Sequence, residues 1–101
     1  MLEVDLYWAA RAGVDPVALL QRLGDRVVAV HVKDGTLDAE AIQAYPPADQ
    51  VPAGMGGVPL AEALDAASAL EFAIVEFDTY AGDLFEAIEQ SRVFLDERAA
   101  R

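Results

Sequence analysis

The chain lacks cysteine, has a single histidine and contains few basic residues. Its 101 residues include no Cys, one His, and seven Lys or Arg against 18 Asp or Glu, which gives a formal net charge of -11. The absence of cysteine excludes disulfides and thiolate chemistry, as is typical of a cytoplasmic protein. The excess of negative charge would repel nucleic acids and anionic membrane surfaces, so we expect neither as a partner.

Long hydrophobic runs are also missing. No apolar stretch approaches membrane-spanning length, and no basic amino terminus followed by an apolar core marks a secretory signal. The composition is nevertheless 54% hydrophobic and 25% charged, as in folded proteins. We therefore expect one soluble, cytoplasmic domain over residues 1–101.

Three short segments rich in branched and aromatic residues predict β-strands, at residues 2–8, 27–33 and 72–78. Helical periodicity lies between and after them. The helices that we expect are residues 15–24, 38–45, 59–71 and 83–99, and the Pro- and Gly-rich segment 46–57 is expected to be a loop. Alternating strands and helices are typical of a parallel sheet with helical crossovers, so the sequence predicts an α/β fold.

Each predicted strand has one apolar face and one face that becomes polar toward its carboxyl end. The polar faces carry Glu3 and Asp5, then His31 and Lys33, then Glu76 and Asp78. Burial of such groups is costly unless they are paired or bind a metal. Because parallel α/β folds bind ligands at the carboxyl ends of their strands, we expect these side chains to share a site.

Asp5, His31 and Glu76 together offer two carboxylate oxygens and one imidazole nitrogen. This set suits a divalent cation such as manganese, magnesium, cobalt or zinc. Two simpler interpretations remain open from the residue types. His31 is then a hydrogen-bonded structural histidine, and Asp5 and Glu76 form salt bridges with Lys33.

The motifs EVDLYW (3–8), HVKD (31–34), VEFD (75–78) and SRVFL (91–95), with a Gly-x-Gly loop between them, resemble a known family. They are similar to the carboxyl-terminal part of the xylose isomerase-like TIM barrels, the sugar phosphate isomerase/epimerase superfamily that includes inosose dehydratases and ketose epimerases. The resemblance covers essentially the whole chain and corresponds to about three of the eight βα units of such a barrel. It implies a partial (β/α) barrel.

The resemblance implies that Asp5, His31 and Glu76 are metal ligands, in a family whose mononuclear metal is held by a Glu, an Asp, a His and a second Glu. The first Glu of that set has no counterpart in this sequence. Glu76 would also transfer the proton next to a substrate carbonyl. The site is therefore expected to be completed by further copies of the chain in a homo-oligomer, or by a complementary amino-terminal barrel fragment.

Several other residues have expected roles around a sugar or cyclitol substrate. Lys33 would neutralise a developing oxyanion, with Asp34 orienting it, and Trp8 would form a wall for the sugar ring. The amides of Gly54 and Gly56 would approach a substrate oxygen or phosphate. Each has a plainer interpretation, as a strand-end lysine, a packed aromatic residue and a flexible turn.

Three hypotheses for function follow. The first is a metal-dependent sugar isomerase or epimerase, active when the barrel is completed. The second is an inactive barrel fragment that acts as a structural, self-associating module through its exposed sheet edges. The third is a small freestanding α/β binding module with a three-ligand metal site, which would have to be monomeric.

Overall fold

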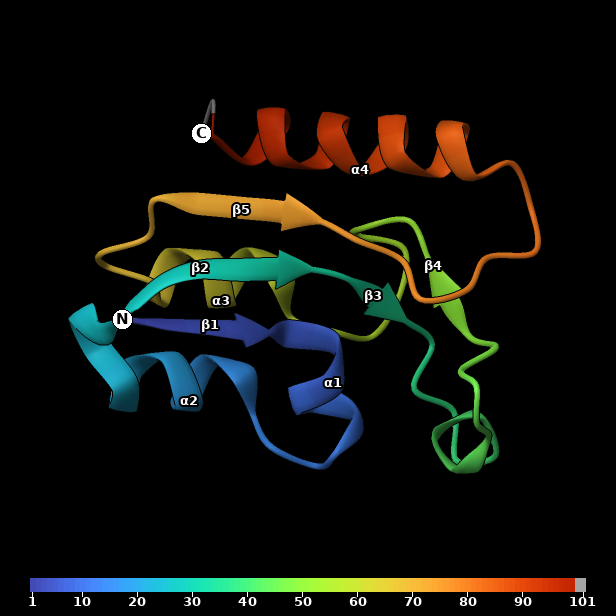
Figure 1. Ribbon diagram of the computed structural model, residues 1–101, viewed down its shortest axis with the longest axis horizontal. Coiled ribbons are helices and arrows are strands. Elements are labelled where there is room, and N and C mark those ends of the chain that lie inside the picture. The colour runs from blue at the N-terminus through green and yellow to red at the C-terminus, as the bar shows by residue number, and fades with distance from the viewer. Residues whose placement is uncertain (100–101) are drawn as a thin grey trace.

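A three-stranded parallel sheet organises the computed structural model, which describes residues 1–99. The strands are β1 (Leu2–Asp5), β2 (Val27–Val32) and β5 (Phe72–Val75), and β2 is central (Figure 1). All three run in one direction, so their carboxyl ends lie at the same edge of the sheet. The predicted α/β fold with a parallel sheet is confirmed, and over residues 1–99 the sheet is open and does not close into a barrel.

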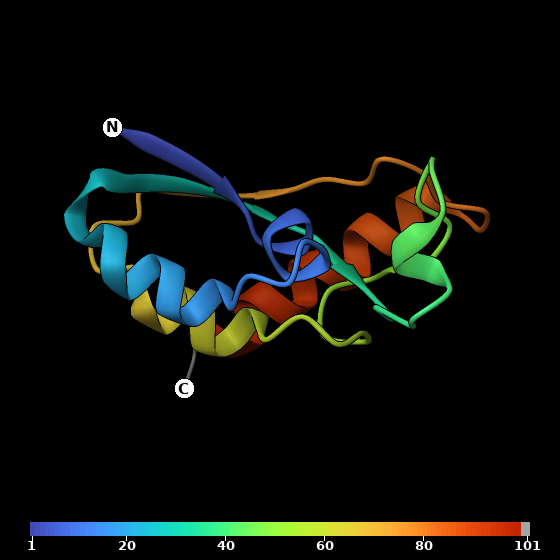
Figure 2. The same ribbon diagram turned by 90° about the horizontal axis from the view of Figure 1, so that it is seen from below.

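Four helices accompany the sheet: α1 (Leu6–Arg11), α2 (Pro16–Leu23), α3 (Leu60–Ala66) and α4 (Leu84–Ala99). The views in Figures 1 and 2 place α2, α3 and α4 on one side of the sheet and leave the opposite face without helices. Two short strands, β3 (Asp34–Gly35) and β4 (Gln50–Val51), form a separate antiparallel pair. Within residues 1–99, no helix combines the length and the apolar character that crossing a membrane requires.

All three predicted strands are shorter than the sequence suggested, β2 by one residue and the other two by three. The first ends at Asp5, whose carboxylate accepts a hydrogen bond from the Trp8 amide and so begins α1. The expectation that residues 6–8 continue the strand is therefore wrong. The third strand ends at Val75, and beyond it the Asp78 amide donates to the side chain of Gln50 instead of to a neighbouring strand.

The predicted helices agree with the structure better than the predicted strands do. Asp15 caps α2 through hydrogen bonds from two backbone amides, Pro16 occupies the first helical position, and Gly24 ends the helix with φ of 62°. The helix α4 follows its expected range. The remaining differences are that α3 ends at Ala66, that residues 38–45 contain only a 3-10 turn at Ala41–Gln43, and that the loop 46–57 contains β4.

The two faces of the sheet differ in what covers them. On the helix side, Val30 and Val32 are buried in one apolar cluster with Leu6, Leu20 and Leu60. On the opposite face, Phe72 is 60% exposed and Ile74 is 40% exposed. The hydrophobic core therefore lies entirely between the sheet and its helices, and the other face carries the polar strand ends.

Asp34, at the start of β3, holds the glycine-rich loop against the sheet. Its fully buried carboxylate accepts hydrogen bonds of 2.9–3.0 Å from the backbone amides of Gly35, Gly54, Gly56 and Val58. Gly54 has φ of 89°, and a Cβ atom at Gly56 would collide with the Gly35 carbonyl. Gly56 is thus required by the close approach of the loop to this carboxylate, and Gly54 by its positive φ.

We predict that Asp34→Asn lowers the free energy of unfolding by about 1–3 kcal/mol, because the new NH2 group would face amide donors and leave them unsatisfied. Chemical denaturation followed by circular dichroism measures the change. Asp25→Asn, at an exposed aspartate, removes the same charge and should leave stability near that of the wild type. Equal stability of the Asp34→Asn variant and the wild type would contradict this account.

Candidate metal centre

The three predicted ligands meet at the carboxyl edge of the sheet. Asp5 is the last residue of β1 and pairs in register with His31 on β2, while Glu76 follows directly after β5. One potential ligand atom from each side chain lies within 4.8 Å of the other two. The structure thus brings together the residues that the sequence selected, and the binding of a metal by them stays a prediction.

His31 has carboxylates on both ring nitrogens. Its Nδ1 atom lies 3.3 Å from Asp5 Oδ2 and 3.1 Å from Glu76 Oε2, and its Nε2 atom lies 3.1 Å from Glu3 Oε1. The histidine side chain is 22% exposed. The imidazole is therefore fixed between two neighbouring strands and remains reachable from solvent.

Lys33 lies next to His31 and its carboxylates, and it pairs with three carboxylates. Its Nζ atom is 2.8 Å from Asp5 Oδ2, Glu76 Oε1 and Asp78 Oδ2, and its side chain is completely buried. An ammonium group has three N–H donors, and each one is used here. Direct contact between Lys33 and a substrate would therefore require one of these pairs to break, and its predicted role on a substrate stays a prediction.

The contacts between Lys33 and the three carboxylates explain the directions of the pKa shifts of Lys33 and Asp78. Burial alone would lower the pKa of Lys33, but its hydrogen bonds to the three carboxylates outweigh burial and raise it above its ordinary value. Burial would raise the pKa of Asp78, but hydrogen bonds from Lys33, Gln50 and Trp8 lower it. The ammonium and the Asp78 carboxylate thus hold one another in their charged forms.

Asp78 connects Lys33 to two further side chains. It accepts hydrogen bonds from Trp8 Nε1 at 3.0 Å and from Gln50 Nε2 at 2.8 Å. Gln50 Oε1 in turn accepts from the Asp78 amide at 2.8 Å. Trp8 therefore lies beside the cluster, on α1 instead of at a strand end, and its predicted contact with a sugar ring stays a prediction.

The cluster formed by His31, Lys33 and their carboxylates carries more negative than positive charge. Four carboxylates, those of Glu3, Asp5, Glu76 and Asp78, surround His31 and the single ammonium of Lys33. While the imidazole is neutral, the carboxylates exceed the ammonium by three charges. Such an excess in a partly buried site attracts a cation, and the imidazole nitrogen favours one that accepts nitrogen as well as oxygen ligands.

Two sequence expectations about neighbouring residues need correction or restatement. Asp34 accepts four backbone amides and makes no hydrogen bond to Lys33 within residues 1–99, so the expectation that it orients Lys33 is wrong. The amides of Gly54 and Gly56, expected to approach a substrate, donate to Asp34. Their role in substrate binding stays a prediction.

Sequence reasoning placed Glu3 and Asp78 on the polar faces but did not select them as site residues. Their signal was the two-residue strand period, because each lies two positions from a predicted ligand. Gln50 was missed altogether. It reaches Asp78 from the long loop, and no local sequence pattern predicts such a contact.

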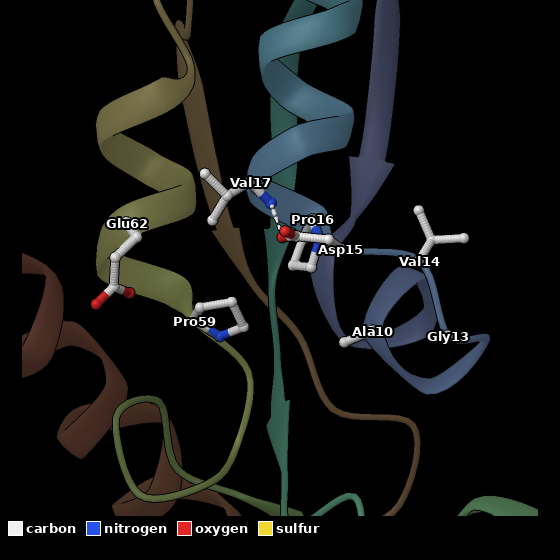
Figure 3. A pocket seen from close by; sticks show the side chains of 8 residues that line it. All are labelled: Ala10, Gly13, Val14, Asp15, Pro16, Val17, Pro59 and Glu62. Atoms are coloured by element: carbon white, nitrogen blue, oxygen red, sulfur yellow. Dashed lines mark hydrogen bonds between the residues drawn. The ribbon is translucent and has the colours of Figure 1, made fainter.

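Two hollows differ in their relation to the cluster. One of about 680 Å³ lies between the start of α2 and the start of α3 (Figure 3). It shares no residue with the cluster, and its Asp15 already caps α2. The other, of about 550 Å³, is lined by Gln50, Thr79 and Tyr80 together with the prolines at 46 and 47. Through Gln50 it adjoins the cluster.

No protein-family model and no curated protein matches the chain. A function is therefore inferred from the geometry and chemistry of the cluster together with the sequence resemblance.

We predict that Lys33→Met lowers the free energy of unfolding by about 3 kcal/mol, the low end for breaking a buried ion pair, because the carboxylates left behind are partly exposed. Divalent cations should restore part of this loss, since they supply the missing charge. Thermal unfolding with and without Mn²⁺ measures both effects, and Arg22→Met, at an exposed residue, is the control. A Lys33→Met variant as stable as the wild type would contradict the account.

Proposed function

We propose that the protein is a divalent-metal-dependent sugar or cyclitol isomerase or epimerase whose site is completed by further βα units. Asp5, His31 and Glu76 are the metal ligands, and the reaction is proton transfer next to a carbonyl. The observation that carries the proposal is the convergence of three ligand atoms within 4.8 Å at the carboxyl ends of three parallel strands.

The donor atoms fit a divalent cation of the borderline or hard class. Two carboxylate oxygens and one imidazole nitrogen suit manganese, magnesium, cobalt or zinc. Three protein ligands are also the number that catalytic metal sites use when they leave positions open for water or substrate. The surplus of negative charge around His31 supports a cation as the occupant.

A divalent cation bound there would polarise a substrate carbonyl and so ease removal of the proton on the neighbouring carbon. Glu76 is the group that takes up and returns this proton. Lys33 holds Glu76 and Asp5 in place through its 2.8 Å contacts. In this arrangement Lys33 positions the carboxylates, and a second proton-transfer group comes from outside these three strands.

The hollow next to Gln50 is the proposed place for the rest of the substrate. Gln50 links it to Asp78, and the Tyr80 ring lines it beside a pair of prolines. Aromatic rings pack well against the apolar faces of sugar rings, while Trp8, fixed by its bond to Asp78, adds a second aromatic surface near the cluster. A polyhydroxylated small molecule suits this mixture of apolar and polar groups.

The sequence resemblance to xylose isomerase-like barrels gives the proposal its reaction class. Such a barrel would supply the fourth metal ligand from a strand next to β1, whose outer edge has no partner within residues 1–99. A second copy of the chain or a complementary barrel fragment would have to provide that strand. The proposal thus makes assembly a condition of activity.

We predict that the wild-type protein binds one equivalent of Mn²⁺ or Co²⁺ and that His31→Ala abolishes this binding, because the only nitrogen ligand is lost. Isothermal titration of metal-free protein measures the stoichiometry. Ser68→Ala, at an exposed residue of the loop before β5, is the control and should bind as the wild type does. Unchanged metal binding in His31→Ala would contradict the ligand assignment.

The reaction class is tested on the same samples. Metal-loaded protein in D2O should exchange the proton next to the carbonyl of a ketose or inosose, as followed by proton NMR, and His31→Ala should not. In a sample that sediments as an oligomer, metal binding without exchange over a panel of ketoses, ketose phosphates and inososes would contradict the isomerase proposal while leaving the metal centre in place.

The uncovered face of the sheet favours a second candidate, a structural module that associates with itself. Phe72 and Ile74 are 60% and 40% exposed there, and β1 and β5 each pair with β2 alone among the described strands. Open strand edges and exposed apolar side chains are sites where chains associate. Such a module would need no metal and no substrate.

We predict that the wild type sediments as an oligomer and that Phe72→Glu shifts it toward monomer, because a charge on this face opposes its burial. Analytical ultracentrifugation over a range of concentrations measures the change. Phe85→Glu, at an 83% exposed residue on α4, is the matched control and should keep the wild-type mass. A wild type that is monomeric at every concentration would contradict association through this face.

A further inference from the structure

Glu3 is the carboxylate outside the three-ligand group that contacts the histidine. It lies two residues before Asp5 on β1, so both side chains point to the same face of the sheet. Asp5 pairs with His31 in register, and Glu3 pairs with Ala29, two residues before His31 on β2. The small side chain of Ala29 leaves the Glu3 carboxylate free to reach diagonally toward the imidazole.

The two nitrogens of His31 have different surroundings. Nδ1 faces the two other candidate ligands, at 3.3 Å from Asp5 Oδ2 and 3.1 Å from Glu76 Oε2. Nε2 faces Glu3 Oε1 alone, at 3.1 Å. A cation held jointly by the three ligands would therefore bind Nδ1, and this would leave Nε2, which faces Glu3, as the nitrogen that carries a proton.

A carboxylate 3.1 Å from Nε2 has a defined consequence for the ring. A neutral imidazole has one protonated nitrogen, and an acceptor at Nε2 favours the tautomer with its lone pair on Nδ1. A carboxylate in this place also fixes the ring plane. Glu3 would thus prepare His31 to bind a cation through Nδ1.

Taking the proposed metal centre as given, we infer that Glu3 is a positioning residue that selects Nδ1 of His31 as the metal-binding atom through a hydrogen bond from Nε2. Glu3 is not a ligand in this arrangement, because its carboxylate lies on the far side of the ring from Asp5 and Glu76. Its side chain is 53% exposed, so its replacement should disturb the sheet little.

The experiment compares zinc binding by the wild type, Glu3→Ala and Glu3→Gln. Loss of the acceptor in Glu3→Ala should weaken Zn²⁺ binding by about tenfold to a hundredfold, the usual effect of removing the partner of a ligating histidine. Glu3→Gln keeps an acceptor oxygen and should recover part of the affinity. Glu71→Ala removes the same charge at the opposite end of the sheet, before β5, and should bind as the wild type does.

Nitrogen-15 NMR of the His31 ring supplies a readout that a general loss of stability would not produce. With Zn²⁺ bound, the wild-type spectrum should show zinc on Nδ1 and a retained proton on Nε2. In Glu3→Ala this single pattern should be replaced by a mixture or by binding through Nε2. Because the wild-type spectrum alone tests which nitrogen is used, the inference remains testable even if a variant folds poorly.

The outcomes separate this inference from the proposed function. Equal affinity of Glu3→Ala and the wild type overturns the role of Glu3 and leaves the metal centre intact. Zinc on Nε2 in the wild type overturns both, because Asp5 and Glu76 lie at Nδ1. A wild type that binds no Zn²⁺ overturns both. Weaker binding in Glu3→Ala, partial recovery in Glu3→Gln and an unchanged Glu71→Ala control support the inference.

Discussion

The buried ammonium of Lys33 is the interaction on which the carboxyl edge of the sheet depends. It is 2.8 Å from carboxylates that come from β1 and from the segment after β5, so one side chain directly after the central strand ties both outer strands to it. Without this charge, acidic groups from separate strands would repel one another at close range. With it, Asp5 and Glu76 can converge on His31 from either side.

A second buried charge holds the loop that follows. Asp34 accepts four backbone amides and fixes the glycine-rich segment, while Gln50 connects β4 to Asp78. The surroundings of Asp34 and those of His31 differ in exposure and in charge. The Asp34 carboxylate is fully buried and satisfied by the backbone, whereas the group around His31 remains partly exposed and has surplus negative charge. The first is structural, and the second is the group for which we propose metal binding.

The sequence predicted those features that depend on local periodicity. Strand alternation placed Asp5, His31 and Glu76 on one face, and capping residues located α2. The errors have two causes. Residues 6–8 form a helix although their composition favours a strand, because the neighbouring Asp5 caps it. The contacts of Gln50 and Asp34 join loops far apart in sequence. Periodicity also could not tell that Lys33 would be fully engaged within the cluster.

The most direct test of the metal centre is an anomalous difference map from crystals grown with Mn²⁺. The account predicts one peak between the carboxylates of Asp5 and Glu76 and Nδ1 of His31, with Lys33 still paired to Asp78. A peak elsewhere on the surface, or no peak at saturating Mn²⁺, would contradict it. The cluster would then be a network of salt bridges that stabilises three strands and binds no metal.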